Sequence, residues 1–129
     1  RPQGEIVWFE NLKLSTKFNA SFSDVATTTL NLEADSEGII PKGAKAIMWQ
    51  GHGRDSGCDT TDCYFHTAPD TNEHWQGTLS PAGLVANAWA RTNLNWQACD
   101  SNGDMAYKVE ATGSSTFSIT LYYKGVQLR

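Results

Sequence analysis

Apolar and polar residues alternate along the last quarter of the chain. Over residues 105–112 the odd positions are apolar and the even positions mostly polar, and the same period of two returns over residues 117–124. This period is typical of antiparallel strands with one buried face. Because Gly113-Ser114-Ser115 between the two stretches is a turn signal, the pattern predicts a β-hairpin.

Further strand signals lie upstream. Residues 25–33 are rich in Thr, and residues 6–14 carry enough Ile, Val and aromatic side chains for one or two strands. Residues 44–50 contain the short apolar run Ile47-Met48-Trp49. A run of this length suits a central strand that is covered on both faces.

Residues 51–80 have a different composition. Three glycines fall within residues 51–57, and residues 68–72 are rich in Pro, Asp, Thr and Asn. This composition predicts long loops around one short strand near Tyr64-Phe65-His66. Long ordered loops on a rigid scaffold often carry function, so the region is a candidate for binding.

The segment 84–98 allows two interpretations. Its alanines, preceded by Ser80-Pro81 as a cap and first helical residue, favour a helix. Its even positions, however, are small or apolar without a break, whereas its odd positions include three Asn. Such sustained alternation is hard to fit to a helix. We therefore expect one long strand, bent or bulged. Asn102-Gly103 is a strong hairpin signal, so we expect a hairpin turn there that leads into the next strand.

The count is about eight strands with turn signals between them. This count predicts an all-β fold, an antiparallel β-sandwich of the jelly-roll kind with long loops in 51–80. At 129 residues the chain is expected to form a single domain over residues 1–129. Its first residue is Arg rather than Met, so we expect a mature product or a fragment of a longer protein.

Composition narrows the range of functions. Charged residues make up 19% of the chain and the net charge is −4, with no block of like charges. Nucleic-acid binding is not expected, because neutralisation of phosphates by basic residues supplies most of that affinity. No apolar run reaches the roughly 18 residues of a membrane span, so membrane insertion is not expected either.

Three cysteines bear on the cellular compartment. Cys58 and Cys63 enclose a short polar loop, and a disulfide between them is expected. Pairing of Cys99 with one of them, or three reduced thiols, are the alternatives. The composition alone leaves the compartment open.

No established metal or catalytic motif accompanies the three histidines, His52, His66 and His74. Their spacing matches no zinc pattern, and residues 100–104 alternate like the first ligands of a calcium loop but lack the later acidic residue. No nucleophile motif surrounds Ser56. We therefore expect no cofactor and no enzymatic activity. Bound Ca²⁺ or Zn²⁺, and a small metal-dependent hydrolase, are the less favoured alternatives.

The outward face of the predicted long strand is the leading candidate for a binding site. A strand over residues 84–98 places six side chains on one face: Asn87, Trp89, Arg91, Asn93, Asn95 and Gln97. Amides donate and accept hydrogen bonds, and an indole offers a flat apolar plate. Together they complement the hydroxyl edges and the C–H faces of sugars. The alternative is a solvated strand face on which Trp89 packs against a neighbouring loop.

The loop region adds a second candidate platform. Trp75 lies next to His74 and close in sequence to Asp70, and we expect these three residues to take part in ligand binding. The tryptophans expected in the core are Trp8, Trp49 and Trp96.

Two stretches resemble a known class of proteins. They are residues 40–47 (IPKGAKAI) and residues 103–113 (GDMAYKVEATG), the second followed by TFSI at 116–119 and YKG at 123–125. They resemble β-sandwich domains at the ends of phage tail fibres and other virion attachment proteins. The resemblance lies in scaffold strands, so no site residue is carried over from it. It implies a distal receptor-binding domain, often trimeric, that recognises cell-surface glycans.

Together these observations predict a non-catalytic, lectin-like binding module, located outside the cell or on a virion surface. The expected partner is a cell-surface glycan or glycoprotein receptor, and the expected oligomer is a homotrimer. The alternative is a structural or decoration domain of a larger assembly, in which the same strand face is buried against a neighbour.

Overall fold

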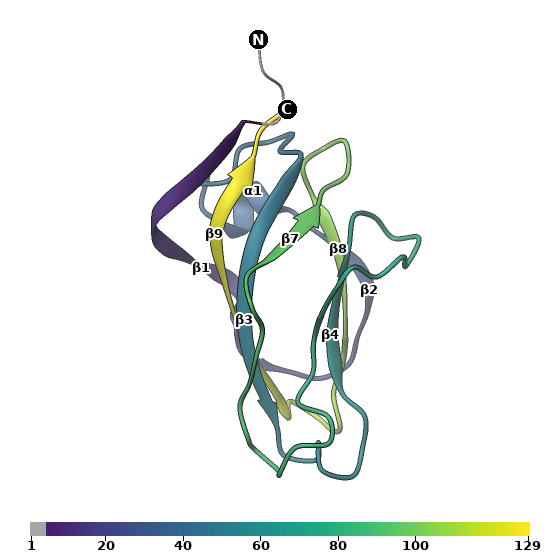
Figure 1. Cartoon of the computed structure of the whole chain (residues 1–129). Coiled ribbons are helices and arrows are strands. Elements are labelled where there is room, and N and C mark those ends of the chain that lie inside the picture. The colour runs from purple at the N-terminus through teal and green to yellow at the C-terminus, as the bar shows by residue number, and fades with distance from the viewer. Residues whose placement is uncertain (1–4) are drawn as a thin grey trace.

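The chain folds as a sandwich of two antiparallel β-sheets (Figure 1). A computed structural model describes residues 5–129. The five-stranded sheet consists of β1 (Ile6–Phe22), β9 (Phe117–Gln127), β3 (Ala46–Asp55), β6 (Ala90–Arg91) and β7 (Asn95–Ala98), the last two both pairing with β3. The four-stranded sheet has the order β2 (Val25–Leu30), β8 (Met105–Glu110), β4 (Tyr64–Ala68) and β5 (Gly77–Leu79). The predicted all-β sandwich is confirmed.

Most connections cross from one sheet to the other. β8 and β9, predicted as a hairpin, lie in different sheets, and so do β7 and β8, which flank the Asn102-Gly103 turn. Both hairpin predictions are therefore wrong. Among the described strands, only β4 and β5 are neighbours both in sequence and in a sheet. The alternation could not reveal this, because both sheets bury one face against the same core and give their strands the same period of two.

Aromatic side chains fill the core between the two sheets. Phe18 of β1 meets Phe65 of β4 and Tyr107 of β8, with ring centroids 4.9 Å apart in each pair. Trp49 of β3 contacts the same Phe65 ring edge to face at 5.8 Å. Ile47, Met48 and Trp49 are all buried, so β3 is the covered central strand that the sequence predicts.

Gly53 lies inside β3, although its glycine-rich surroundings predict a loop. A Cβ at this position would lie 2.8 Å from the ring of Phe117 and 3.3 Å from Leu79. The residue has no side chain because these two side chains lie directly against the backbone of β3. The predicted long loops therefore shrink to residues 56–63 and 69–76, with β4 between them.

The predicted long strand over 84–98 is wrong. Its first part forms turns, in which Asn87 has a φ of 64°, and only the short strands β6 and β7 remain. Thr92 separates them. Its side-chain Oγ1 accepts a hydrogen bond from the Gly51 amide at 3.0 Å, which takes the place of a strand-to-strand bond at that position of β3.

The short helix α1 (Leu32–Asp35) replaces the end of the strand expected over 25–33. Asn31 caps the helix, since its side chain accepts a hydrogen bond from the Ala34 amide at 3.0 Å. An Asn followed by acidic residues in the first turn is an ordinary helix start, and this signal outweighs the Thr-rich strand pattern before it.

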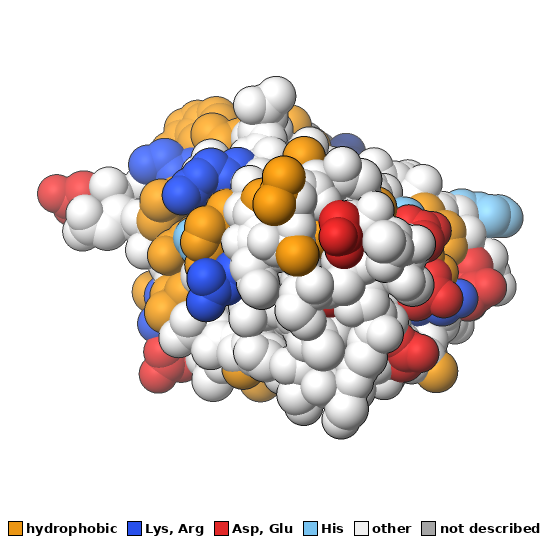
Figure 2. All heavy atoms as spheres, turned by 90° about the horizontal axis from the view of Figure 1, so that it is seen from below, with side chains coloured by type: hydrophobic (Ala, Val, Ile, Leu, Met, Phe, Trp, Pro, Cys, Tyr) orange, Lys and Arg blue, Asp and Glu red, His pale blue; other side chains and the backbone are white. Residues whose placement is uncertain are grey.

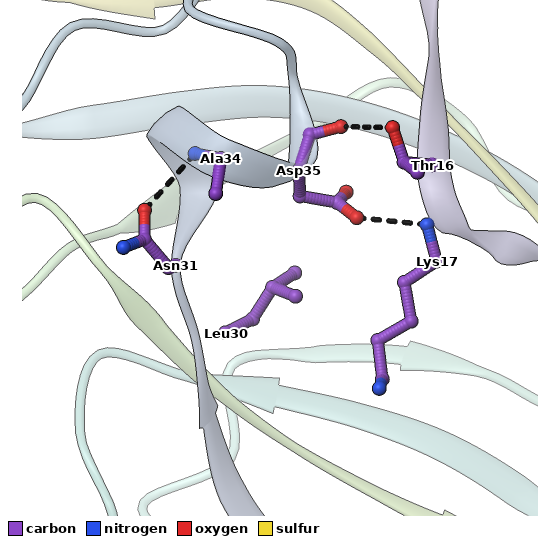
Figure 3. Close-up of a pocket in the computed structure, with 6 residues that line it drawn as sticks. All are labelled: Thr16, Lys17, Leu30, Asn31, Ala34 and Asp35. Carbon is purple, nitrogen blue, oxygen red and sulfur yellow. Dashed lines mark hydrogen bonds between the residues drawn. The ribbon is translucent and has the colours of Figure 1, made fainter.

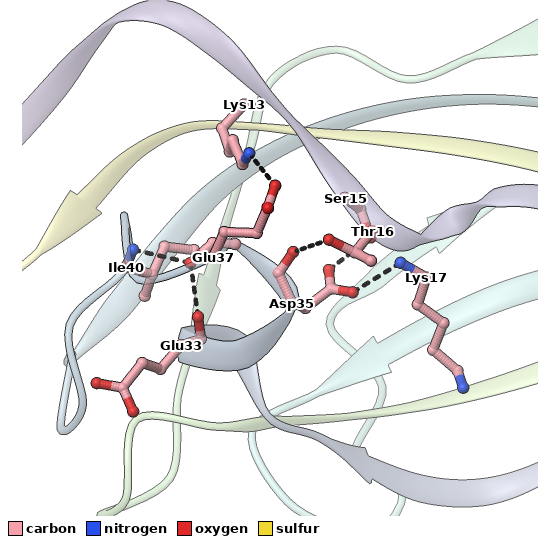
Figure 4. A network of polar contacts seen from close by, with 9 residues as sticks. Lys13, Ser15, Thr16, Lys17, Glu33, Asp35, Glu37 and Ile40 are labelled. Atoms are coloured by element: carbon pink, nitrogen blue, oxygen red, sulfur yellow. Dashed lines mark hydrogen bonds and ion pairs between the residues drawn. The ribbon is translucent and has the colours of Figure 1, made fainter.

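Asp35 anchors this helix to β1. Its buried carboxylate accepts hydrogen bonds from the Ser15 hydroxyl at 2.5 Å and from the Lys17 amide at 2.8 Å (Figure 4). The hydroxyl of Tyr123 on β9 donates to the same carboxylate at 2.5 Å. Burial, together with the adjacent carboxylate, raises the pKa of Tyr123 well above its usual value, so this hydroxyl remains a donor.

Candidate functional site: the outer face of the five-stranded sheet

Two tryptophans cover one row of the five-stranded sheet from outside. Trp8 pairs with Gly125, Gly125 with Met48, and Met48 with Trp96, so the four residues form a line across β1, β9, β3 and β7. The two indoles meet edge to face over the middle of this line, with centroids 6.0 Å apart. Trp8 is 55% exposed and Trp96 41% exposed. Their assignment to the core is therefore wrong.

Gln97 was predicted to lie on the outer face, but its side chain points into the core. Its side chain is fully buried, and its Oε1 accepts a hydrogen bond from the Thr67 hydroxyl of β4 at 2.7 Å. Its Nε2 donates to Gln76 at 2.8 Å and to the backbone oxygen of Ala98 at 2.9 Å. The amide thus bridges the two sheets with its polar atoms bonded.

Between β6 and β7, the side chains that face outward change from odd-numbered to even-numbered positions. Arg91 pairs with His52 and lies on the outer face, whereas Asn95 pairs with Trp49 on the side that faces the core. A continuous strand would have kept both side chains on one face. The connection 92–94 breaks this continuity, so the amide-rich face predicted for the segment does not exist as one surface.

A compact aromatic cluster lies farther along the same outer face. The imidazole of His52 meets Trp89 edge to face at 5.0 Å and Tyr122 at 5.9 Å. The guanidinium of Arg54 lies 4.6 Å from the centre of the Trp89 ring, within cation–π range. Of the residues predicted to bind a ligand, Trp89 and Arg91 are the ones that belong to this cluster.

A shallow pocket of about 270 Å³ opens beside the cluster. Its lining residues come from the four strands β1, β3, β6 and β9: Leu12, Gln50, Gly51, His52, Arg91 and Tyr122. Partial burial lowers the pKa of His52 below its usual value, and the positive charge of Arg91 lowers this pKa further. The imidazole is therefore neutral at pH 7, and it can donate and accept hydrogen bonds.

The other predicted site residues lie apart from this pocket. Asn87 is exposed in the turn before β6, where its backbone amide donates to the Asp55 oxygen at 3.1 Å. Asn93 is exposed in the connection after β6, and the Asn95 side chain donates to its backbone oxygen at 2.9 Å. Asp70 accepts a hydrogen bond from the Asn72 amide at 3.0 Å and so stabilises a loop turn.

Trp75 belongs to a second aromatic cluster, on the outer face of the four-stranded sheet. Its ring stacks on His66 at 5.4 Å, and His66 stacks on Tyr64 at 4.0 Å. The Nδ1 of His66 also lies 2.9 Å from the hydroxyl of Thr78. Burial, followed by the charge of Lys108, lowers the pKa of His66. His74 is exposed beside Trp75 and has no part in this stack.

A pocket of about 310 Å³ between β1 and α1 belongs to the scaffold (Figure 3). Figure 3 shows that Asp35 is bonded to the Lys17 amide and, through its backbone oxygen, to the Thr16 hydroxyl. The carboxylate holds α1 against β1 and is not directed at a ligand.

All three cysteines are buried free thiols, so the expected Cys58–Cys63 disulfide is not present. The Cys58 sulfur lies 3.6 Å from the backbone oxygens of Leu84 and Val85, to which it can donate. Burial is the first cause that raises the pKa of Cys63, and likewise that of Cys99, to about 12. Residues 5–129 hold no group of three or more His, Cys, Asp or Glu side chains able to bind a metal ion. Nor do they include a helix long and apolar enough to cross a membrane.

His52, Arg54 and Tyr122 are the site residues that the sequence analysis missed. A usable signal was present, because Gln50, His52 and Arg54 alternate with glycines. Polar side chains that alternate with glycine match a strand whose inner face is covered too closely for a side chain. The glycines themselves favoured a loop interpretation and concealed this period.

Comparison with known proteins identifies a fold and no family. The chain matches no protein-family model and no curated protein. Among solved structures, it is similar to the coat protein of Tobacco streak virus, with a TM-score of 0.53 and 13% sequence identity. The similarity covers 98% of this chain and 89% of the coat protein chain. At this level of identity, the likeness shows a shared β-sandwich fold.

Proposed function

We propose that this chain is a structural domain of a larger assembly of the virion type. In this proposal the outer face of the five-stranded sheet is buried against neighbouring copies of the chain. The observation that carries the proposal is the exposed Trp8–Trp96 pair. These two large apolar rings lie on the outer surface of the sheet, and much of their surface remains exposed.

The apolar surface extends beyond the two tryptophans along β1. Three further side chains of this strand are each at least 36% exposed: Ile6, Leu12 and Leu14. Single exposed apolar side chains are normal on a soluble protein, whereas a contiguous group commonly marks an interface. This group therefore supports a contact with another protein chain.

The position of β1 supports the same function. β1 is the edge strand of the five-stranded sheet, and it pairs only with β9 among the described strands. An open edge presents unpaired backbone groups that can bind another chain. Two shifts in register, between Trp8 and Lys13 and between Leu14 and Asn19, divide this edge into shorter pieces. Such irregularities limit uncontrolled strand addition and leave the side chains as the main contact.

The fold similarity is the third support. One structure that the chain resembles over nearly its whole length is that of a virus coat protein. A virion-associated, non-enzymatic role is therefore consistent with each of these observations.

Sedimentation velocity tests the proposal. The wild-type chain, studied from micromolar to submillimolar concentration, is expected to form oligomers reversibly. Replacing both Trp8 and Trp96 by Ser is expected to raise the dissociation constant by about a hundredfold or more, because buried tryptophans commonly contribute about 2 kcal/mol each to an interface.

The matched control is Trp75→Ser, which removes a partly exposed tryptophan from the opposite sheet. This variant is expected to associate like the wild type. A wild-type chain that stays monomeric throughout the concentration range would contradict the proposal. Equal association of the Trp8/Trp96 double variant and the wild type would contradict the choice of face.

Carbohydrate recognition is a second candidate function. The observation that favours it is the exposure of two aromatic clusters, one built on Trp89 and one on Trp75. A glycan array with the wild type, Trp89→Ala and Trp75→Ala tests this function. It predicts selective binding that at least one variant loses, and equal binding by all three proteins would exclude both clusters as sugar platforms.

A further inference from the structure

Two arginines on the outer face of the five-stranded sheet have no ionic partner within the described chain. Arg54 and Arg91 are both exposed, and the one salt bridge among residues 5–129 joins Lys13 to Glu37 at 2.5 Å. The contact with the Trp89 ring already orders the Arg54 guanidinium. A pre-ordered guanidinium loses less conformational freedom when it binds an anion, and its planar donors match a carboxylate.

Charge is unequally divided between the two sheets. Five basic residues lie on strands of the five-stranded sheet: Lys13, Lys17, Arg54, Arg91 and Lys124. The acidic residues on these strands are Glu10 and the fully buried Asp55. Lys13 is paired with Glu37, and Lys17 lies over the Tyr107 ring of the other sheet. The unbalanced positive charge on the outer face beside Trp89 therefore comes from Arg54 and Arg91, although the chain as a whole carries a net charge of −4.

The loop 56–63 has the opposite character. It carries Asp59 and Asp62, both exposed, and it contains no basic residue. Within the described part of the chain, neither carboxylate forms a salt bridge. The loop is ordered by its own backbone, since the amides of Thr60 and Thr61 donate to the Gly57 oxygen at 3.3 and 3.1 Å.

The two charged surfaces lie at the same end of the sandwich but on opposite sides. Arg54 is the next to last residue of β3, and the loop 56–63 then crosses to β4 in the other sheet. Figure 2 views this end of the molecule and shows Lys, Arg and hydrophobic side chains gathered on one side, with Asp and Glu mostly on the other. Copies placed side by side in the same orientation would bring opposite charges together.

We infer that copies of this chain associate head to tail, with Asp59 and Asp62 of one copy bound to Arg54 and Arg91 of the next. The inference rests on the proposed function and specifies its contact. Each carboxylate would enter the surface formed by His52, Trp89 and the pocket beside them. A contact between two different surfaces closes into a ring, such as the homotrimer expected from the sequence, when the rotation between copies allows it.

Ionic strength gives the first test. The wild-type dissociation constant, measured by sedimentation velocity, is expected to rise by about tenfold or more between 50 and 500 mM NaCl, because salt screens exposed charges. The variants R54E/R91E and D59K/D62K are each expected to raise it by about a hundredfold or more at low salt.

Mixing the two variants gives the decisive test. R54E/R91E keeps the acidic loop, and D59K/D62K keeps the basic face. Each alone is expected to be monomeric, because its loop and its face carry like charges. An equimolar mixture is expected to associate again, because the acidic loop of the first variant meets the unchanged arginines of the second, and the introduced lysines of the second meet the introduced glutamates of the first. K42E/K45E, which changes the net charge as much as R54E/R91E at two exposed positions before β3, is the control and is expected to associate like the wild type.

Four outcomes would overturn the inference. A mixture that remains monomeric excludes the head-to-tail pairing. Association that survives R54E/R91E but is lost in the Trp8/Trp96 double variant excludes these charges and leaves the proposed function intact. Binding of a labelled single-stranded oligonucleotide by the wild type, lost in R54E/R91E, would assign the arginines to phosphate groups. A wild type that is monomeric at both salt concentrations contradicts the proposed function as well.

Discussion

The carboxylate of Asp55, at the end of β3, accepts hydrogen bonds from both the backbone amide and the hydroxyl of Thr112, in the connection between β8 and β9. The Gly57 amide donates to the same carboxylate at 2.9 Å, and the Thr116 hydroxyl donates to it at 3.1 Å. Burial by itself raises the pKa of Asp55, but these hydrogen bonds outweigh it and leave the pKa below its usual value. One carboxylate thus ties together three segments at this end of the sandwich.

The free energy of unfolding is therefore expected to fall in acid. Because the pKa of Asp55 is lower in the folded than in the unfolded chain, its stabilisation is complete above the ordinary value of 3.8 and is lost as the pH falls through the folded value. Asp55→Asn should lower the free energy of unfolding at pH 7 by about 2–3 kcal/mol and weaken its dependence on pH below about 4. Urea unfolding between pH 3 and 7 measures both effects. The exposed Asp70→Asn should change neither, and a similar loss in that variant would disprove the special role of Asp55.

Gly53→Ala is expected to destabilise the fold by about 1–3 kcal/mol, because the added methyl group would lie 2.8 Å from the ring of Phe117. Gly113→Ala is the control. Its Cβ would meet a methyl group of Thr116 at 3.2 Å in an exposed turn, where the neighbour can move. Thermal unfolding of the two variants should give a clearly lower midpoint for Gly53→Ala, and equal midpoints would refute the close packing proposed for β3.

Gln97→Ala is expected to cost about 2–3 kcal/mol of stability, because it leaves the buried Thr67 hydroxyl without its acceptor. Asn95→Ala, two residues earlier on β7, is expected to cost less than about 1 kcal/mol, since its side chain bonds locally to the Asn93 oxygen. Denaturant unfolding of both variants tests the inward position of Gln97. A loss for Gln97→Ala that is no larger than that for Asn95→Ala would contradict the buried, hydrogen-bonded position of Gln97.

The thiols are expected to be unreactive in the native protein. Burial holds the pKa of Cys63 and of Cys99 near 12, so almost none of these two thiols is thiolate at pH 8. The Cys58 side chain is buried, which limits access of a reagent to its sulfur. A thiol-specific chromogenic reagent should therefore react slowly with the folded chain, and it should titrate three thiols after unfolding in urea without reductant. A count of one thiol in urea would mean that a disulfide forms after all.

The sequence predicted the architecture better than the connections. The alternation in β8 and β9 is a direct consequence of one buried face, so it identified both strands correctly. It carries no information about which sheet a strand joins, because that choice depends on contacts between residues far apart in the chain. The sequence also failed to predict which side chains of β7 face the core, for a related reason. The Thr92 side chain accepts a hydrogen bond from the backbone of β3, and no local sequence pattern predicts such a bond.

The candidate site was predictable only in part. Trp89 and Arg91 lie beside His52 on one outer surface, since they are two residues apart near β6, and their part in ligand binding stays a prediction. Their partners His52 and Arg54 come from β3, whose glycines are required by packing and look like loop residues in the sequence. The exposure of Trp8 was hidden as well, because a large aromatic residue in a strand is more often found in a core.

The crossing of the chain between the two sheets also governs how the protein reaches its native state. Six of the eight connections between successive strands pass from one sheet to the other, so neither sheet can be completed before the other has begun. Folds dominated by contacts between distant parts of the chain fold slowly, over milliseconds to seconds. During that time β1 stays unpaired until β9, its partner much later in the sequence, has formed. β1, the longest described strand, therefore has no partner until β9 has left the ribosome, so assembly must follow the synthesis of β9.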